Sequence, residues 1–87
     1  MQFLHSREFM NSGDIAEVNS SHQCNITLMD DINFNNYKNG KSFKCIGGFF
    51  EKLPARIAAP SSGYWNIVLD LAGGTATIKH SVRIIKR

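Results

Sequence analysis

The sequence lacks any apolar run approaching the roughly 18 residues that a membrane-spanning helix requires. We also expect no secretory leader, because Arg7 and Glu8 interrupt the opening segment where a signal peptide needs an unbroken apolar stretch. We therefore expect a soluble, cytoplasmic protein that makes no contact with a membrane.

Cysteine is scarce, since the chain has only Cys24 and Cys45. A single pair in a chain without a signal peptide does not make a disulfide framework, and it offers too few ligands for a zinc site. We expect two buried free thiols, with neither a metal nor any other cofactor. The sequence leaves open whether the two cysteines lie close together in the fold.

Motifs for catalysis are missing as well. No G-x-S-x-G sequence holds a nucleophile, and the glycine pairs at 47–48 and 73–74 lack the Lys-Ser/Thr and the following helix of a phosphate-binding loop. The three histidines fall on different predicted elements: His5, His22 and His80. We therefore expect a protein that is not an enzyme, although a meeting of His22 and His80 in the folded chain stays open.

What the sequence does contain is an ordinary globular composition. Its 87 residues are 43% hydrophobic and 20% charged, which predicts one folded domain over residues 1–87. The formal net charge is +3, from ten Lys and Arg against seven Asp and Glu. Positive charge clusters only at 83–87, so a solvated basic surface is favoured over a phosphate-binding one.

Alternation of apolar and polar residues predicts two strands in the last third of the chain, because successive residues of a strand point to opposite faces. The apolar face of the first strand carries Trp65, Ile67, Leu69 and Leu71. The apolar face of the second carries Ala76, Ile78, His80, Val82 and Ile84. Gly73 and Gly74 lie between the two strands and predict a β-hairpin, in which His80 is a core histidine.

The stretch HQCNITLMDD, residues 22–31, alternates too. Its apolar face carries Cys24, Ile26 and Leu28. Asn25 and Thr27 are then expected to face solvent. His22 lies on the face of Cys24, but no further His or Cys has the spacing of a metal-binding set. The stretch is therefore predicted to be a strand that enters a capped turn.

Three shorter segments complete the predicted strands. They lie at 14–18, at 42–46 and, as an edge strand, between the prolines of 54–60. Phe43 and Cys45 share one face of the second segment. The pair Gly47-Gly48 predicts a bulge or turn that lets Phe49 and Phe50 reach the core.

A helix of one or two turns is predicted near 31–38, in DDINFNNYK, because an aspartate at its start caps free N–H groups and Asn39-Gly40 ends it. Phe34 and Tyr37, three residues apart, are expected to anchor this turn on the strands. Together these segments predict an all-β fold, a small β-sandwich or barrel-like sandwich of six to seven short, mostly antiparallel strands.

One stretch rich in acidic and amide residues partly matches a calcium-binding loop. Asp31, Asn33 and Asn35 match the first three ligands of a calcium loop, D-x-N-x-N. Asn36 stands where that loop needs glycine, and Ser42 stands where a glutamate should close the site. We therefore expect no calcium site, and side chains that bond the local backbone instead.

Several blocks of the chain resemble one known family: LMDD at 28–31, Tyr37-Lys38, GGFF at 47–50, PARI at 54–57, GYWN at 63–66 and the glycines at 73–74. The sequence is similar to a small bacterial family of a domain of unknown function, some members of which are joined to TIR domains. The resemblance implies a compact β-sandwich with a stand-alone or partner role beside a module that in bacteria often acts on NAD or signals in defence. It brings no catalytic residues.

Three functions remain. The first is a non-catalytic recognition or interaction module that senses a small ligand or binds a protein partner, and that we expect to form a homo-oligomer. Its proposed contact residues are Lys38, Arg56 and Tyr64. The second is nucleic-acid binding through a basic strand face without stacking aromatics. That face carries Lys79, Arg83, Lys86 and Arg87. The third is an enzyme whose motif is not recognised.

Overall fold

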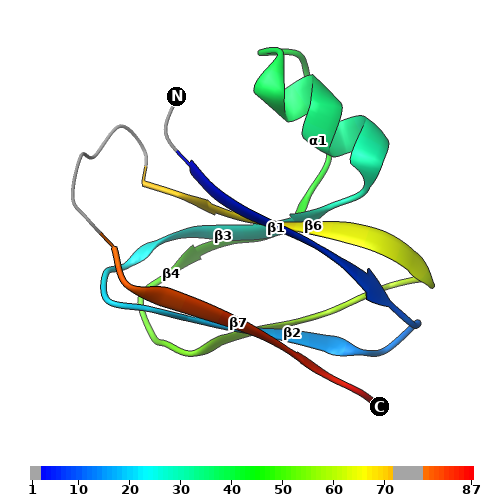
Figure 1. Cartoon of the computed structure of the whole chain (residues 1–87). Helices are drawn as coiled ribbons and strands as arrows, with labels where there is room; N and C mark the ends of the chain where they lie inside the picture. Colours follow the sequence, from blue (N-terminus) through cyan, green and yellow to red (C-terminus); the bar gives the residue numbers. More distant parts are fainter. Residues whose placement is uncertain (1–2, 72–77) are drawn as a thin grey trace.

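The structure is a computed structural model that describes residues 3–71 and 78–87. Within these residues the strands are β1 (Phe3–Met10), β2 (Ile15–Ser20), β3 (Cys24–Met29), β4 (Ile46–Phe50), β5 (Ala55–Ala58), β6 (Gly63–Asp70) and β7 (His80–Ile85), with one helix, α1 (Asp31–Lys38). The strands form two antiparallel layers, sheet A with the order β1-β6-β3-β4 and sheet B with the order β5-β2-β7 (Figure 1). The predicted β-sandwich of six to seven strands with one short helix is confirmed.

The main core lies between the inner faces of the two sheets. It consists of Met10, Ala16, Val18, Cys24, Ile26, Leu28, Ala55, Ile57, Ala59, Trp65, Ile67 and Leu69. Alternation correctly predicted the inner faces of β3 and β6, because these side chains pack against the opposite layer. The segment bracketed by prolines is β5, which lies at an edge of sheet B as predicted.

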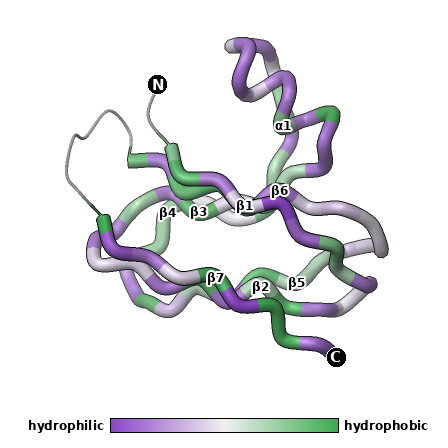
Figure 2. The backbone as a smooth tube through the Cα atoms, viewed as in Figure 1, coloured by the Kyte–Doolittle hydropathy of each residue, from purple (hydrophilic) through white to green (hydrophobic). Residues whose placement is uncertain are grey.

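Sheet A is covered on its outer face as well, because α1 packs across it (Figure 1). The helix is mostly hydrophilic (Figure 2), so few of its side chains can attach it to the sheet. Phe34 and Tyr37 do so, as predicted, and form a second buried cluster with Met29 and Val68. Thr27 is 9% exposed in the strand below, which corrects its predicted place in solvent. The central parts of the outer faces of β3 and β6 are therefore interior, at Thr27, Met29, Asn66 and Val68.

The predicted hairpin between the last two strands is wrong. β6 pairs with β1 and β3 in sheet A, whereas β7 pairs with β2 in sheet B. The chain therefore crosses from one layer to the other between these strands, and Gly73 and Gly74 lie outside the described residues. His80 is exposed at the start of β7, which corrects its predicted place in the core. Alternation defines the two faces of a strand but does not select its partner.

The segment between α1 and β4 also departs from the prediction. β4 begins at Ile46, so Phe43 lies before the strand, where its ring contacts Tyr37. Gly47 and Gly48 lie within β4 and form no turn between strands. At Gly47, φ is +111° and an added Cβ would lie 2.3 Å from the carbonyl oxygen of Ile26. Only glycine fits there, because both the backbone angle and the neighbouring strand exclude a side chain.

Both cysteines are free thiols. Cys24 is buried, as predicted, and burial raises its thiol pKa. Cys45 is exposed, which corrects the expectation that both thiols are buried. Cys24 is paired with Phe50 at one end of the β3–β4 ladder, whereas Cys45 precedes Ile46 at the other. The two cysteines are therefore separated by about the length of the ladder, too far for a disulfide.

Replacing Met29 by alanine tests whether the outer face of sheet A is interior. Met29 is 2% exposed beneath α1, although by alternation it shares the face of Asn25 and Thr27, which were expected to face solvent. We expect the free energy of unfolding to fall by about 2–5 kcal/mol, because truncation leaves a cavity under the helix. Urea denaturation measures this change.

Ile32→Ala is the matched control, since Ile32 is 75% exposed on the same helix. Its effect should stay within about 0.5 kcal/mol. Equal, small effects of the two substitutions would contradict the placement of α1 on the sheet.

Candidate functional site on the helix-bearing face

A buried amide joins α1 to sheet A. The side chain of Asn66, on β6, is 1% exposed. Its nitrogen donates to the carbonyl oxygen of Met29 at 3.2 Å and to the Asp31 carboxylate at 2.8 Å. Its oxygen lies 2.7 Å from Nε2 of His5, so this imidazole nitrogen carries the proton and donates. Three segments, β1, β3 and the first turn of α1, are thus fixed to one central side chain.

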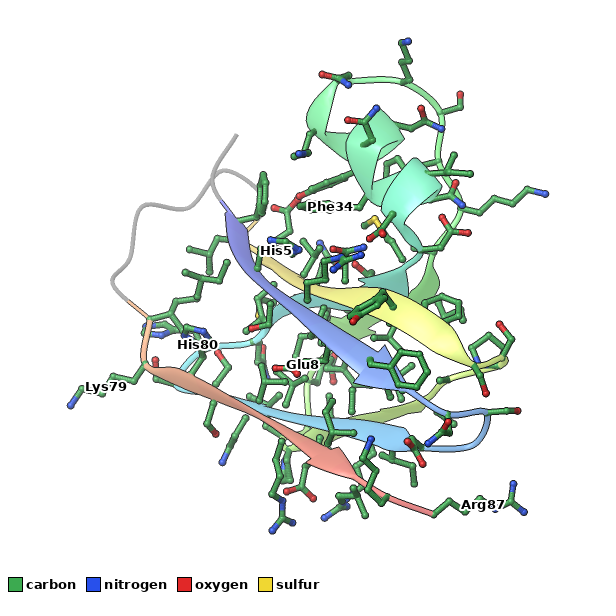
Figure 3. All side chains as sticks on the ribbon, turned by 45° about the vertical axis from the view of Figure 1, so that its right-hand side comes forward. His5, Glu8, Phe34, Lys79, His80 and Arg87 are labelled. Atoms are coloured by element: carbon green, nitrogen blue, oxygen red, sulfur yellow. The ribbon has the colours of Figure 1, made fainter. Side chains whose placement is uncertain are left out.

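The imidazole of His5 is also held by the helix. Its ring stacks on Phe34 with a centroid distance of 4.0 Å and an interplanar angle of 19°. Figure 3 shows Phe34 extending from α1 toward His5 on β1. Lys38, one of the predicted contact residues, lies above the same ring, with Nζ 4.9 Å from its centroid. His5 and Lys38 therefore contribute to helix packing.

Asp31 and Arg7 form a two-pronged ion pair at the start of α1. Nε of Arg7 donates to Oδ1 at 3.1 Å, and Nη2 donates to Oδ2 at 2.8 Å. Arg7 is the main cause, and the Asn66 amide the second, of a pKa for Asp31 lowered to about 2. The carboxylate is also well placed in the first helical turn, where the helix dipole favours negative charge.

The same guanidinium lies over an exposed aromatic ring. Cζ of Arg7 is 3.9 Å from the ring centroid of Tyr64, and Phe9 packs edge-on against that ring at 5.4 Å. Phe9 is 46% and Tyr64 51% exposed. Asp31 holds the arginine, and the arginine covers the tyrosine, so this arginine–aromatic patch, formed by Arg7, Phe9 and Tyr64, has a fixed shape. Tyr64, one of the proposed contact residues, is thus part of an exposed patch.

Exposed large hydrophobic side chains are unevenly distributed. Within residues 3–71 and 78–87 they are Phe9, Ile32, Phe43, Ile46, Phe49 and Tyr64. All six belong to sheet A, to α1 or to the segment between α1 and β4. No residue of β2, β5 or β7 is among them, so the exposed large hydrophobic side chains of the described chain belong to the helix-bearing layer.

A cavity of about 220 Å³ opens on this layer, beside the helix. It is lined by Asn25, Thr27, Met29, Tyr37, Phe43, Cys45, Gly48 and Asp70. The Tyr37 hydroxyl donates to the Asp70 carboxylate at 2.5 Å on one wall. Burial, followed by this carboxylate, raises the pKa of Tyr37, so its hydroxyl stays protonated.

Two of the predicted basic residues share one carboxylate on sheet B. Arg56 and Arg83 bind opposite oxygens of the Glu17 carboxylate, each at 2.9 Å. Glu17 lies on β2 between the two arginines, which come from the neighbouring strands β5 and β7. Exposed pairs of this kind add little stability, but they lower the positive potential that a phosphate backbone would meet.

The C-terminal basic residues are engaged by a buried carboxylate. Asp14 is 2% exposed and accepts from the backbone N–H of Arg87 at 3.0 Å. Nζ of Lys86 lies 3.3 Å from the same carboxylate. The Arg87 backbone N–H, then that of Asn11, lowers the Asp14 pKa. Lys79 lies at the opposite end of β7 from Arg87 (Figure 3), so these residues do not form one compact basic patch.

The structure brings the other chemistry-bearing residues into ordinary packing roles. Asn33 and Asn35 lie with Asp31 on α1, where residues two apart point about 200° from one another, so their oxygens do not converge as in a calcium loop. His22 is exposed after β2, and its Nδ1 lies 2.8 Å from the Ser21 hydroxyl. In the described residues no three His, Cys, Asp or Glu side chains gather as a metal-binding group.

Sequence reasoning missed the residues that organise this face. Strand β1 was not predicted, so the roles of His5, Arg7 and Phe9 were not seen. Asn66 alternates with Trp65 and Ile67, so the predicted strand placed it on the polar face opposite to them. The run from Trp65 to Leu69 is buried throughout, and such a continuous run is typical of a strand covered on both faces. In the sequence this run is apolar except for Asn66, and that near-continuous apolar run was the available sign of a covered outer face.

These features define a two-layer β-sandwich whose larger sheet carries a docked helix and an exposed arginine–aromatic patch. The family described as a domain of unknown function, DUF1883, matches residues 1–87, and the chain belongs to this family. No curated protein and no solved structure matches the chain. No helix in residues 3–71 and 78–87 is long and apolar enough to cross a membrane.

The Asp31 carboxyl should titrate with a midpoint of about 2, followed by NMR of its side-chain carbon. Replacing Arg7 by glutamine should move the midpoint toward the ordinary value of about 3.9. Because the folded pKa lies below the unfolded one, the pair stabilises the fold above pH ~4 and loses this effect as the pH falls toward 2.

Lys38→Gln serves as the control, since it removes a cation from the same helix without touching Asp31. In this variant the titration midpoint of the Asp31 carboxyl should match that of the unmodified protein. A midpoint near the ordinary value in the unmodified protein would show that the Arg7 pair does not form in solution.

Proposed function

We propose that this domain is a non-catalytic recognition module that binds a protein partner through the helix-bearing face of sheet A. The observation that carries the proposal is the confinement of exposed large hydrophobic side chains to this one layer. Exposed apolar surface gathered on one side of a small domain is typical of protein interaction sites. When a partner buries them, these hydrophobic side chains would supply most of the binding free energy.

The arginine–aromatic patch has the composition of an interface hot spot. Tyrosine and arginine are enriched among residues whose truncation costs most binding energy. Arg7 is already fixed by Asp31 and by its stacking on Tyr64, so binding would freeze little additional side-chain motion. Such preorganisation favours docking of a partner onto a formed surface.

The edge strands of both sheets carry features that discourage pairing with a strand of a partner, which favours binding through the helix-bearing face instead. Features known to discourage edge pairing are the exposed Glu8 on the inner side of β1, the glycines of β4, the prolines flanking β5 and the basic residues of β7. A second copy of the chain would therefore also dock through the helix-bearing face. Self-association remains part of the proposal in that form.

The proposal places the chain in a bacterial cytoplasm, as the similarity to domains joined to TIR modules implies. There it would serve as the recognition component beside an effector, in a role that needs no chemistry of its own. Nucleic-acid binding through β7 is less well supported, because carboxylates pair with the side chains of two of the four basic residues named for it, Arg83 with Glu17 and Lys86 with Asp14.

Selection of peptides from a random displayed library tests the proposal. Peptides that bind the full chain should perturb NMR signals of Arg7, Phe9 and Tyr64. The double variant Phe9→Ser and Tyr64→Ser should bind them at least tenfold more weakly, because it removes the exposed rings. Both positions are about half exposed, so the variant should still fold.

Ser81→Ala on β7 is the matched control and should bind the peptides normally, because it alters the opposite layer. If a second copy is the partner, the unmodified chain should sediment as a dimer and the double variant as a monomer. Peptides that map to sheet B, or that bind the double variant equally well, would contradict the proposal.

A further inference from the structure

The cavity beside α1 contains polar groups that the fold leaves without partners. Thr27 is 9% exposed, lines the cavity, and its hydroxyl makes no hydrogen bond within the described residues. No fully enclosed side-chain oxygen or nitrogen in the described chain lacks a partner. The small exposed part of Thr27 therefore includes its hydroxyl, which faces the cavity.

Asn25, two residues before Thr27 on β3, is a second polar residue that has no side-chain hydrogen bond within the described residues. Its side chain lines the same cavity and also forms no hydrogen bond within the described chain. An amide offers two donors and an acceptor, and a hydroxyl offers one donor and two acceptor positions. Both groups are open to the cavity and are not used by the fold, so their donors and acceptors are available to a ligand that enters it.

The walls of the cavity limit what this ligand is. The rings of Tyr37 and Phe43 meet edge to face at 5.1 Å, and Phe43 is 41% exposed beside the opening. No lysine or arginine is among the lining residues, which disfavours a phosphate or a carboxylate. The volume of about 220 Å³ is smaller than the roughly 300–1,000 Å³ of a typical small-molecule site. A cavity of this volume has room for a ligand with one ring system.

We propose that this cavity binds one planar nitrogen heterocycle of the size of a nucleobase, hydrogen-bonded by Thr27 and Asn25 and contacted by the rings of Tyr37 and Phe43. Paired donors and acceptors on the edge of such a ring match an amide and a hydroxyl, and its face suits an aromatic wall. The site lies beyond the arginine–aromatic patch, so it adds a small-ligand function to the proposed docking of a protein.

The experiment is an NMR titration of the full chain with adenosine, guanosine, cytidine and uridine. At least one nucleoside at millimolar concentration should shift the Asn25 side-chain amide and the backbone amides of Thr27 and Gly48 in a saturable way. Absence of a response to all four nucleosides would overturn the proposal. So would binding of glucose at these residues in place of the nucleosides.

Thr27→Val is the decisive variant, because it removes the hydroxyl and keeps the branched shape. Nucleoside binding should weaken roughly three- to tenfold, the loss expected for one neutral hydrogen bond. Thermal stability should not fall, because the hydroxyl has no partner in the folded chain. Lower stability with unchanged binding would show that Thr27 is purely structural and would overturn its role in the site.

Phosphorylated and polymeric probes distinguish the source of the ring. A nucleoside 5′-monophosphate should bind within about twofold of its nucleoside, because no cation lines the cavity. Tighter, salt-sensitive binding that inorganic phosphate displaces would assign the effect to the basic surface and overturn the proposal. If a single-stranded homo-oligomer shifts the same signals, the source is a base in a strand; if only the nucleoside does, it is a free compound.

Variants at one proposed site should leave binding at the other unchanged, so the peptide site and the nucleoside site can be tested independently. Phe9→Ser with Tyr64→Ser should leave nucleoside binding unchanged, since neither residue lines the cavity. Thr27→Val should leave peptide binding unchanged, since Thr27 is buried beneath the surface. Loss of both activities in both variants would show that the two sites are one and would overturn the separate ligand site.

Discussion

The side-chain amide of Asn66 lies inside the contact between α1 and sheet A, and its hydrogen bonds determine whether the helix stays there. An eight-residue helix is far too short to be stable alone, and α1 is mostly polar. Two aromatic side chains supply its apolar contact, whereas Asn66 links its first turn to β1 and β3. Because the Asn66 amide is buried and bridges all three segments, its removal breaks every one of these hydrogen bonds at once, which costs more than the loss of one surface hydrogen bond.

The surface features follow from this attachment. With α1 in place, Asp31 holds Arg7, and Arg7 lies over the Tyr64 ring, so the exposed rings have one arrangement. On the other side of the helix, Tyr37 reaches Asp70 and forms a wall of the cavity. Both proposed binding sites are therefore built from the same helix docking, although they use different residues. Sheet B carries the Glu17 ion pairs instead, and none of the exposed large hydrophobic side chains of the described residues lies on its strands.

The sequence predicted the layers better than their connections. Alternation placed Trp65, Ile67 and Leu69 correctly because burial between two sheets leaves a period of two. It could not pair β7 with β2, since that choice depends on contacts between distant segments. It also assigned Thr27 and Asn66 to a polar face, because a polar residue beneath a helix looks the same in sequence as one in solvent. The helix and its anchors, Phe34 and Tyr37, were predictable from a cap and a spacing, but what they cover was not.

Native-state amide hydrogen exchange of Asn66→Ala, compared with the unmodified chain, tests the central role of this amide most directly. The backbone N–H of Phe34 donates to the Asp30 carbonyl at 2.9 Å in the first turn of α1, so it reports on that turn. The account predicts that exchange in α1 accelerates about 10- to 100-fold in the variant, while the amides of β2 and β5 in sheet B keep more of their protection. Unchanged protection of α1 in Asn66→Ala would contradict it, because the helix would then be held by its aromatic side chains alone.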